Sequence, residues 1–159
     1  MSDHHHEGGC SCGQVRYRLT SDPMFVHCCH CTSCQRETGS EFAINALIET
    51  DRVEVLSGTT EAIAIPAESG SDQKIIRCPE CKSALWSFYA GPDEEVAFVR
   101  AGTLDEPGRV PPDVHIFTRS KLPWLELPEN AKCFDVYYEP ASTWPEAALK
   151  RRALTSWSF

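Results

Sequence analysis

The cysteines of this chain are grouped in a way that is typical of metal binding. Nine are present, and seven of them fall into three short clusters. Zinc is held by four ligands in closed structural sites, and by three ligands plus one open position in catalytic sites. Four plus three accounts for all seven clustered cysteines. The pattern therefore predicts two zinc ions per chain, one structural and one reactive.

The predicted structural site combines two pairs of cysteines that are far apart in the sequence. The C-x-x-C spacing of the second pair is usual for zinc sites, and Pro79 favours the turn that points both sulfurs inward. Zinc would staple the N-terminal strand to a later hairpin, so folding would be coupled to metal binding. Two disulfides or a redox C-x-x-C are the alternatives, but the redox motif is typical of a βαβ setting that this chain lacks. The predicted ligands are Cys10, Cys12, Cys78 and Cys81.

The predicted reactive site is the C-x-C-x-x-C run formed by Cys29, Cys31 and Cys34. Three sulfurs so close in sequence can occupy three corners of one tetrahedron and leave the fourth to an exchangeable ligand. Coordination to a metal deprotonates a thiol. We therefore expect a substrate thiol to bind there as the thiolate and to act as a nucleophile at neutral pH.

The alternative is that a fourth protein ligand closes this second site. Successive side chains of an extended segment point to opposite faces, so Cys28 is expected to face the core rather than the metal. With three thiolates present, His27 and His30 are expected to have structural or supporting roles. The candidates for a closing ligand are Cys28, His27, His30, His115 and Cys133.

The segments between the clusters predict a mostly β fold, in a sandwich or barrel-like arrangement. Short runs of alternating or apolar residues are separated by Gly and Pro turns. The expected strands cover residues 14–19, 25–28, 42–48, 53–56, 61–65, 74–77, 85–89, 96–100 and 114–118.

Only the C-terminal region predicts a helix. Thr143 and Glu146 have the spacing of a capping box, in which Thr143 would be the N-cap residue. We accordingly expect a disordered N-terminus over residues 1–7, a zinc-binding β domain over residues 8–139, and a tail with a short helix over residues 140–159.

Composition narrows the classes of partner. The formal net charge is −8, from 15 basic and 23 acidic residues. An acidic chain without a basic cluster argues against nucleic acid. No stretch approaches the roughly 20 apolar residues of a membrane span, and the N-terminus does not read as a secretory signal. The clustered, odd number of cysteines suits a reducing cytosol, so a cytoplasmic location is expected.

The cysteine clusters and the residues around them resemble the glutathione-dependent formaldehyde-activating enzyme family, also called the Gfa or centromere protein V-like family. The resemblance implies a mostly β fold of the kind called a β-tent. It also implies the same division of the seven cysteines between a structural and a catalytic zinc. The matching segments, within about residues 8 to 128, are residues 9–13, 27–36, 38–39, 77–81, 114–117 and 120–124.

The resemblance further implies a reaction. The family's namesake reaction joins glutathione and formaldehyde to give S-hydroxymethylglutathione, and it is classed as a carbon–sulfur lyase in the reverse sense. The expected small-molecule partners are therefore a thiol, glutathione, and formaldehyde or a related aldehyde. The alternative from another class is a non-catalytic, zinc-stabilised β module that binds a partner.

This chemistry needs a proton donor for the resulting alkoxide and donors for the carboxylates of glutathione. Candidates for the first role are His30, Arg36, Thr38 and His115. Candidates for the second role are Arg36, Arg119 and Lys121. Phe117 and Trp124 are expected in the core, because large aromatic side chains dominate buried area.

Overall fold

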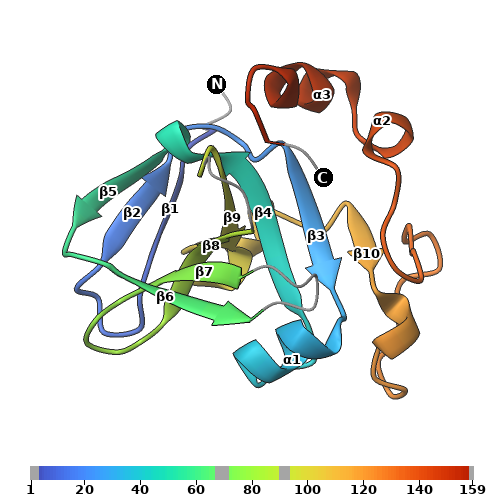
Figure 1. Cartoon of the computed structure of the whole chain (residues 1–159), viewed down its shortest axis with the longest axis horizontal. Helices are drawn as coiled ribbons and strands as arrows, with labels where there is room; N and C mark the ends of the chain where they lie inside the picture. The colour runs from blue at the N-terminus through green and yellow to red at the C-terminus, as the bar shows by residue number, and fades with distance from the viewer. Residues whose placement is uncertain (1–3, 67–71, 90–93, 158–159) are drawn as a thin grey trace.

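The chain forms two β-sheets, and residues of both contribute to one hydrophobic core (Figure 1). The computed structural model describes residues 4–66, 72–89 and 94–157. Within these ranges it contains ten strands and few helices, so the predicted mostly β fold is confirmed. The smaller sheet is antiparallel. In spatial order it consists of β1 (His6–Gly9), β2 (Arg16–Leu19) and β5 (Val53–Ser57).

The larger sheet has seven strands among the described residues. Neighbouring strands are antiparallel except at one edge, where β10 runs parallel to β3. In spatial order the strands are β10 (Val114–Ile116), β3 (Phe25–Cys29), β4 (Ala43–Glu49), β9 (Val96–Arg100), β8 (Ala84–Phe88), β7 (Asp72–Arg77) and β6 (Glu61–Pro66).

The helices are short and lie at the margins of the sheets. Figure 1 shows α1 at the end of β3, and α2 and α3 beyond β3 and β10. The α-helices are α1 (Thr32–Thr38), α2 (Pro140–Thr143) and α3 (Glu146–Ala153). Single 3-10 turns cover Thr50–Arg52, Ala101–Thr103, Pro107–Arg109 and Thr118–Ser120. No helix in the described ranges is long and apolar enough to cross a membrane.

The central strands of the larger sheet are buried on both faces, because their side chains alternate between two cores. Ala46 and Ile48 of β4 pack into a core that includes Tyr17 of the smaller sheet. Leu47, between them, packs into a second core that includes Trp144 of the C-terminal region. All five residues of β9 are buried. Coverage on both faces explains why its first four residues form a continuous apolar run.

The N-terminus differs from the expected disorder of residues 1–7. Residues 1–3 lie outside the described residues, but His6 and Glu7 belong to β1, which pairs with β2. His6 is buried, and its Nε2 lies 2.7 Å from Oδ1 of Asp22. The segment carries no apolar alternation, so its sequence gives no strand signal, and pairing with β2 supplies the order instead.

The predicted C-terminal helix is present, but it begins differently. Its N-cap residue is Pro145, which makes no side-chain capping bond, and Thr143 instead ends α2. The capping-box prediction is therefore wrong. Trp144 and Ala148 are both buried in the second core. The C-terminal segment thus packs on the large sheet and covers the face on which Cys29 lies.

Candidate metal centres

The structure brings together the four cysteines predicted for the structural site. Their sulfurs all lie within 4.8 Å of one another. The sulfurs of Cys10 and Cys12 are 3.5 Å apart, and those of Cys12 and Cys78 are 3.8 Å apart. Four sulfurs held tetrahedrally at about 2.3 Å from zinc would lie about 3.8 Å from one another. The spacing therefore fits a four-thiolate metal site. The group consists of Cys10, Cys12, Cys78 and Cys81.

Two tight turns present these sulfurs. In the first turn, the backbone N–H of Val15 donates to the Cys10 sulfur at 3.3 Å. In the second, Lys82 adopts a positive φ of 64°, and its N–H donates to the Cys78 carbonyl at 3.0 Å. Hydrogen bonds from Ser83 lower the pKa of Cys81 to about 5. Such donors favour the thiolate, the form that binds metal.

The structure also brings together Cys29, Cys31 and Cys34, and all three side chains are buried. Cys29 ends β3, and Cys31 is the N-cap residue of α1. The Cys34 backbone N–H donates to the Cys31 sulfur at 3.2 Å. Gly39 ends the helix in the left-handed region at φ 65°. The end of β3 and the short helix α1 therefore bring the three sulfurs close together.

Without a cation, these three thiols cannot all ionise. Hydrogen bonds from the Cys29 and Cys34 side chains lower the pKa of Cys31 to about 3. Hydrogen bonds with Cys31 and Cys34, together with burial, raise the pKa of Cys29. For Cys34, the bond from Cys29 lowers the pKa, but the contact with Cys31 and burial outweigh it and raise the pKa to about 12. The group thus carries about one negative charge on its own, and a divalent cation would stabilise all three thiolates.

The candidates for a closing ligand lie elsewhere. Among the described residues, the three-cysteine group includes no fourth Cys, His, Asp or Glu. His27 is held by a short hydrogen bond between its Nε2 and the Tyr138 hydroxyl. Burial lowers the pKa of His27 to about 3, so it is neutral at physiological pH. Cys133 is exposed and lies outside the group.

The other three candidates form a separate cluster. Cys28, His30 and His115 place their ligand atoms within 4.8 Å of one another. Burial lowers the pKa of His30 to about 4, and it also lowers the pKa of His115. As expected, Cys28 is buried, at 1% exposure.

An ion-pair network beside the three cysteines has no signal in the sequence. Glu37 of α1 accepts hydrogen bonds from Arg77 and Arg100, each at 2.7 Å. The side chains of Glu37 and Arg100 are 7% and 8% exposed. The positive charge of Arg100 favours the thiolate of Cys34. Spacing could not have shown this network, because its members come from α1, β7 and β9.

The residues predicted to donate to the alkoxide or to the carboxylates of glutathione differ in exposure and in hydrogen bonding. Arg36 and Arg119 are exposed. Lys121 donates to the Leu125 carbonyl at 2.7 Å, and the hydroxyl of Thr38 donates to the Cys34 carbonyl at 2.7 Å. Of the two aromatic residues expected in the core, Phe117 is partly buried against the second core.

The prediction that Trp124 lies in the core is wrong. Its side chain is 68% exposed, and its Nε1 donates to Glu41 at 2.8 Å. This surface bond satisfies the polar edge of the ring and leaves its apolar face in solvent.

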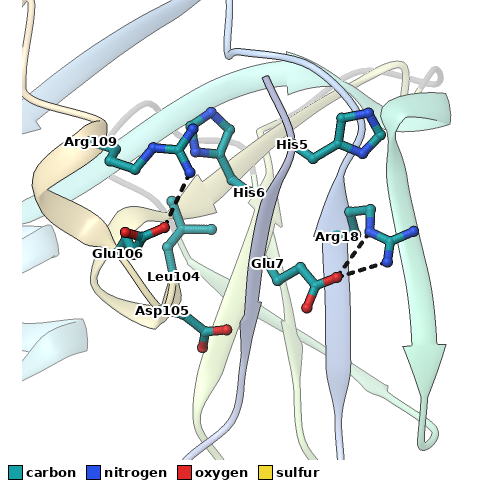
Figure 2. A pocket seen from close by; sticks show the side chains of 8 residues that line it. All are labelled: His5, His6, Glu7, Arg18, Leu104, Asp105, Glu106 and Arg109. Carbon is teal, nitrogen blue, oxygen red and sulfur yellow. Dashed lines mark hydrogen bonds and ion pairs between the residues drawn. The ribbon is translucent and has the colours of Figure 1, made fainter. Parts of the chain in front are cut away.

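A surface cavity of about 540 Å³ lies beside β1 (Figure 2). It is lined mostly by charged side chains, and ion pairs join Arg18 to Glu7 and Arg109 to Glu106. None of its lining residues is a cysteine. The lining residues are His5, His6, Glu7, Arg18, Leu104, Asp105, Glu106 and Arg109.

Comparison with known proteins places the chain in a family. The family described as "Glutathione-dependent formaldehyde-activating enzyme" matches residues 5–120. A Halomonas elongata protein named "Putative glutathione-dependent formaldehyde-activating enzyme" is 34% identical over 82% of this chain and 87% of its own length. A Talaromyces marneffei protein with the same name is 25% identical, over 76% of this chain and 65% of its own length.

A Rhodobacter sphaeroides protein of known crystal structure shares 19% identity and a TM-score of 0.44, over 62% of this chain and 87% of that chain. That likeness is too weak to support an inference. The family match and the Halomonas relative, in contrast, both span most of the sequence. The chain therefore belongs to the glutathione-dependent formaldehyde-activating enzyme family.

Proposed function

We propose that the chain is a zinc enzyme that joins glutathione to formaldehyde or a related aldehyde. The observation that carries the proposal is the buried group of Cys29, Cys31 and Cys34, to which the described residues add no fourth ligand. The names of the relatives in two organisms support glutathione and formaldehyde as the substrates. In the reverse reaction the carbon–sulfur bond of the adduct is broken, so the proposed activity is that of a carbon–sulfur lyase.

The two cysteine groups would have different tasks. The four-cysteine group would hold a structural zinc that staples the N-terminal turn to the β7–β8 hairpin of a β-tent. The three-cysteine group would hold a catalytic zinc, whose chemistry is to keep an incoming thiol ionised at neutral pH. The chain would thus carry at least two zinc ions. All nine cysteines lie in the described residues and are free, which suits the reducing cytoplasm.

The reaction itself is an addition. The glutathione sulfur attacks the carbonyl carbon of formaldehyde, a carbon–sulfur bond forms, and the electron pair of the C=O π bond moves to oxygen. That oxygen takes up one proton, which balances the proton that the thiol lost on ionising, and becomes the hydroxyl of the product. The buried cysteines position the sulfur, and Arg100 adds positive charge on the same side of the sheet. Arg36 and Arg119 are exposed, and we assign them to the substrate's carboxylates.

The test is a rate measurement on the zinc-saturated chain. Exchange between formaldehyde and its glutathione adduct is followed by NMR, with and without protein. We expect exchange faster than the uncatalysed reaction, and a return to the uncatalysed rate in Cys31→Ser. Cys133→Ser is the matched control, because its thiol is exposed and outside all three groups. Full metal loading without faster exchange would instead favour a non-catalytic zinc-stabilised module.

A further inference from the structure

The run from Cys28 to Cys31 presents ligands on two opposite faces of the larger sheet. Cys29 and Cys31 join the three-cysteine group, while Cys28 and His30 join His115. The alternation follows from the extended backbone, which His30 continues by donating its N–H to the Ile116 carbonyl at 3.0 Å. On the parallel neighbour β10, His115 pairs in register with Cys28, so their side chains share a face.

We propose that Cys28, His30 and His115 form a third metal site, which binds one zinc ion or a chemically similar divalent transition-metal ion. We call these residues the Cys-His-His group. The proposal is independent of the proposed function, because the group lies on the other face of β3 and shares no ligand with the three-cysteine group.

The distances within the group are close to those of a tetrahedral metal centre. The Cys28 sulfur lies 3.5 Å from Nε2 of His30, and this Nε2 lies 3.0 Å from Nδ1 of His115. Ligand atoms at about 2.3 Å for sulfur and about 2.0–2.1 Å for nitrogen from zinc lie roughly 3.3–3.6 Å apart. Small shifts of the His115 ring would therefore complete the geometry.

Hydrogen bonding does not satisfy this cluster. A single atom, Nε2 of His30, is the partner of both the Cys28 sulfur and Nδ1 of His115. In one tautomer it has one proton to donate, and in the other it has one lone pair to offer. A cation at the centre would accept a lone pair from all three atoms at once, which no arrangement of protons achieves.

The donor set and the surroundings define the class of cation. One thiolate and two imidazoles suit zinc and similar borderline metals better than calcium or magnesium, which prefer oxygen. Cys28 and His30 are almost completely buried, whereas His115 is partly exposed. Solvent therefore reaches the group from the His115 side, where a water molecule would be the fourth ligand. The metal would also tie β10, an edge strand of only three residues, to its neighbour β3.

The test is a metal count on the intact chain, saturated with zinc, desalted and measured by mass spectrometry. We expect Cys28→Ser and His115→Asn each to lose one equivalent relative to the unchanged chain. His115→Asn guards against failure of the buried Cys28→Ser variant to fold. Cys133→Ser should lose none, because this exposed cysteine pairs with His115 across a β-bridge but its sulfur is not in the group. Cadmium NMR should show a further resonance, upfield of the thiolate-rich sites, that disappears in the same two variants.

Two results would overturn the proposal. One is an unchanged count in both Cys28→Ser and His115→Asn, which would leave the cluster as a hydrogen-bonded contact. The other is an equal loss in Cys133→Ser, which would make the loss unspecific. The Cys31→Ser variant separates this question from catalysis: it should lose a different equivalent, so that Cys28→Ser with Cys31→Ser loses two.

Discussion

The sulfur of Cys31 accepts a hydrogen bond from the backbone N–H of Cys34, so one atom both caps α1 and points into the three-cysteine group. Serine is among the best N-cap residues, and its hydroxyl oxygen can accept the same bond. It is, however, a poor replacement for a thiolate ligand. Cys31→Ser therefore separates the fold of the helix from the metal chemistry of the site.

The two cysteine groups should respond differently to substitution. Cys31→Ser should lose catalysis and cost about 1–3 kcal/mol of unfolding free energy, within the usual range for a single substitution. Cys78→Ser should abolish the cooperative unfolding transition, because a zinc ion held by the four-cysteine group would join segments that are 66 residues apart, and its binding would be coupled to folding. Circular dichroism during urea unfolding measures both. A cooperative transition of ordinary midpoint in Cys78→Ser would contradict the structural role.

The buried ion-pair network beside the three-cysteine group should be sensitive to loss of charge. Glu37→Gln leaves the charges of Arg77 and Arg100 without their shared carboxylate. We expect a loss of about 3–5 kcal/mol, the usual cost of breaking a buried ion pair. The matched control is Glu61→Gln, whose partner Lys82 is 60% exposed. Exposed pairs contribute about 0–1 kcal/mol. Equal urea midpoints for the two variants would refute the burial argument.

The pair between Glu49 of β4 and Arg151 of α3 should make stability depend on pH. Burial raises the pKa of Glu49, but the bond from Arg151 outweighs it and the net shift is downward. A lowered folded-state pKa contributes stability above the ordinary value of 4.5 and loses it as the pH falls through the folded-state value. Arg151→Met should thus cost about 1.5–3 kcal/mol at neutral pH and progressively less in acid.

Lys150→Met is the matched control for that pair. The contact of Lys150 with Glu146 is almost fully exposed, so its loss should change the unfolding free energy little at any pH. Thermal unfolding of both variants at neutral and acidic pH provides the comparison. A pH-independent cost in Arg151→Met would argue against the ionised pair.

The C-terminal segment should behave as part of the β domain. Trp144 is 4% exposed, stacks on Phe25 with ring centroids 5.1 Å apart, and donates to the Tyr138 hydroxyl at 2.7 Å. Trp144→Ala should cost about 3–5 kcal/mol by opening a cavity in the second core. Leu154→Ala, at a side chain that is 89% exposed, should stay within about 0.5 kcal/mol. A small effect at Trp144 would show that the tail is a separate unit.

The sequence predicts the cysteine groups well because the spacing within each cluster is local. A C-x-C or C-x-x-C run places its own sulfurs close together. The meeting of the two distant pairs in the four-cysteine group is predicted from the number of ligands that zinc needs, not from local spacing. Period-two patterns likewise predict the strands. The structure adds pairings between distant segments, such as Cys28 with His115 and Glu37 with Arg100. Such contacts depend on strand register and order, which one sequence does not display.

The central claim is that a zinc ion held by Cys29, Cys31 and Cys34 keeps its fourth position for the substrate thiol. The most direct measurement is a crystal structure at the zinc absorption edge after soaking with glutathione. The account predicts an anomalous peak about 2.3 Å from each of the three sulfurs, with the glutathione sulfur as the fourth ligand. A fourth ligand supplied by the protein chain, or no metal among these three cysteines, would contradict it.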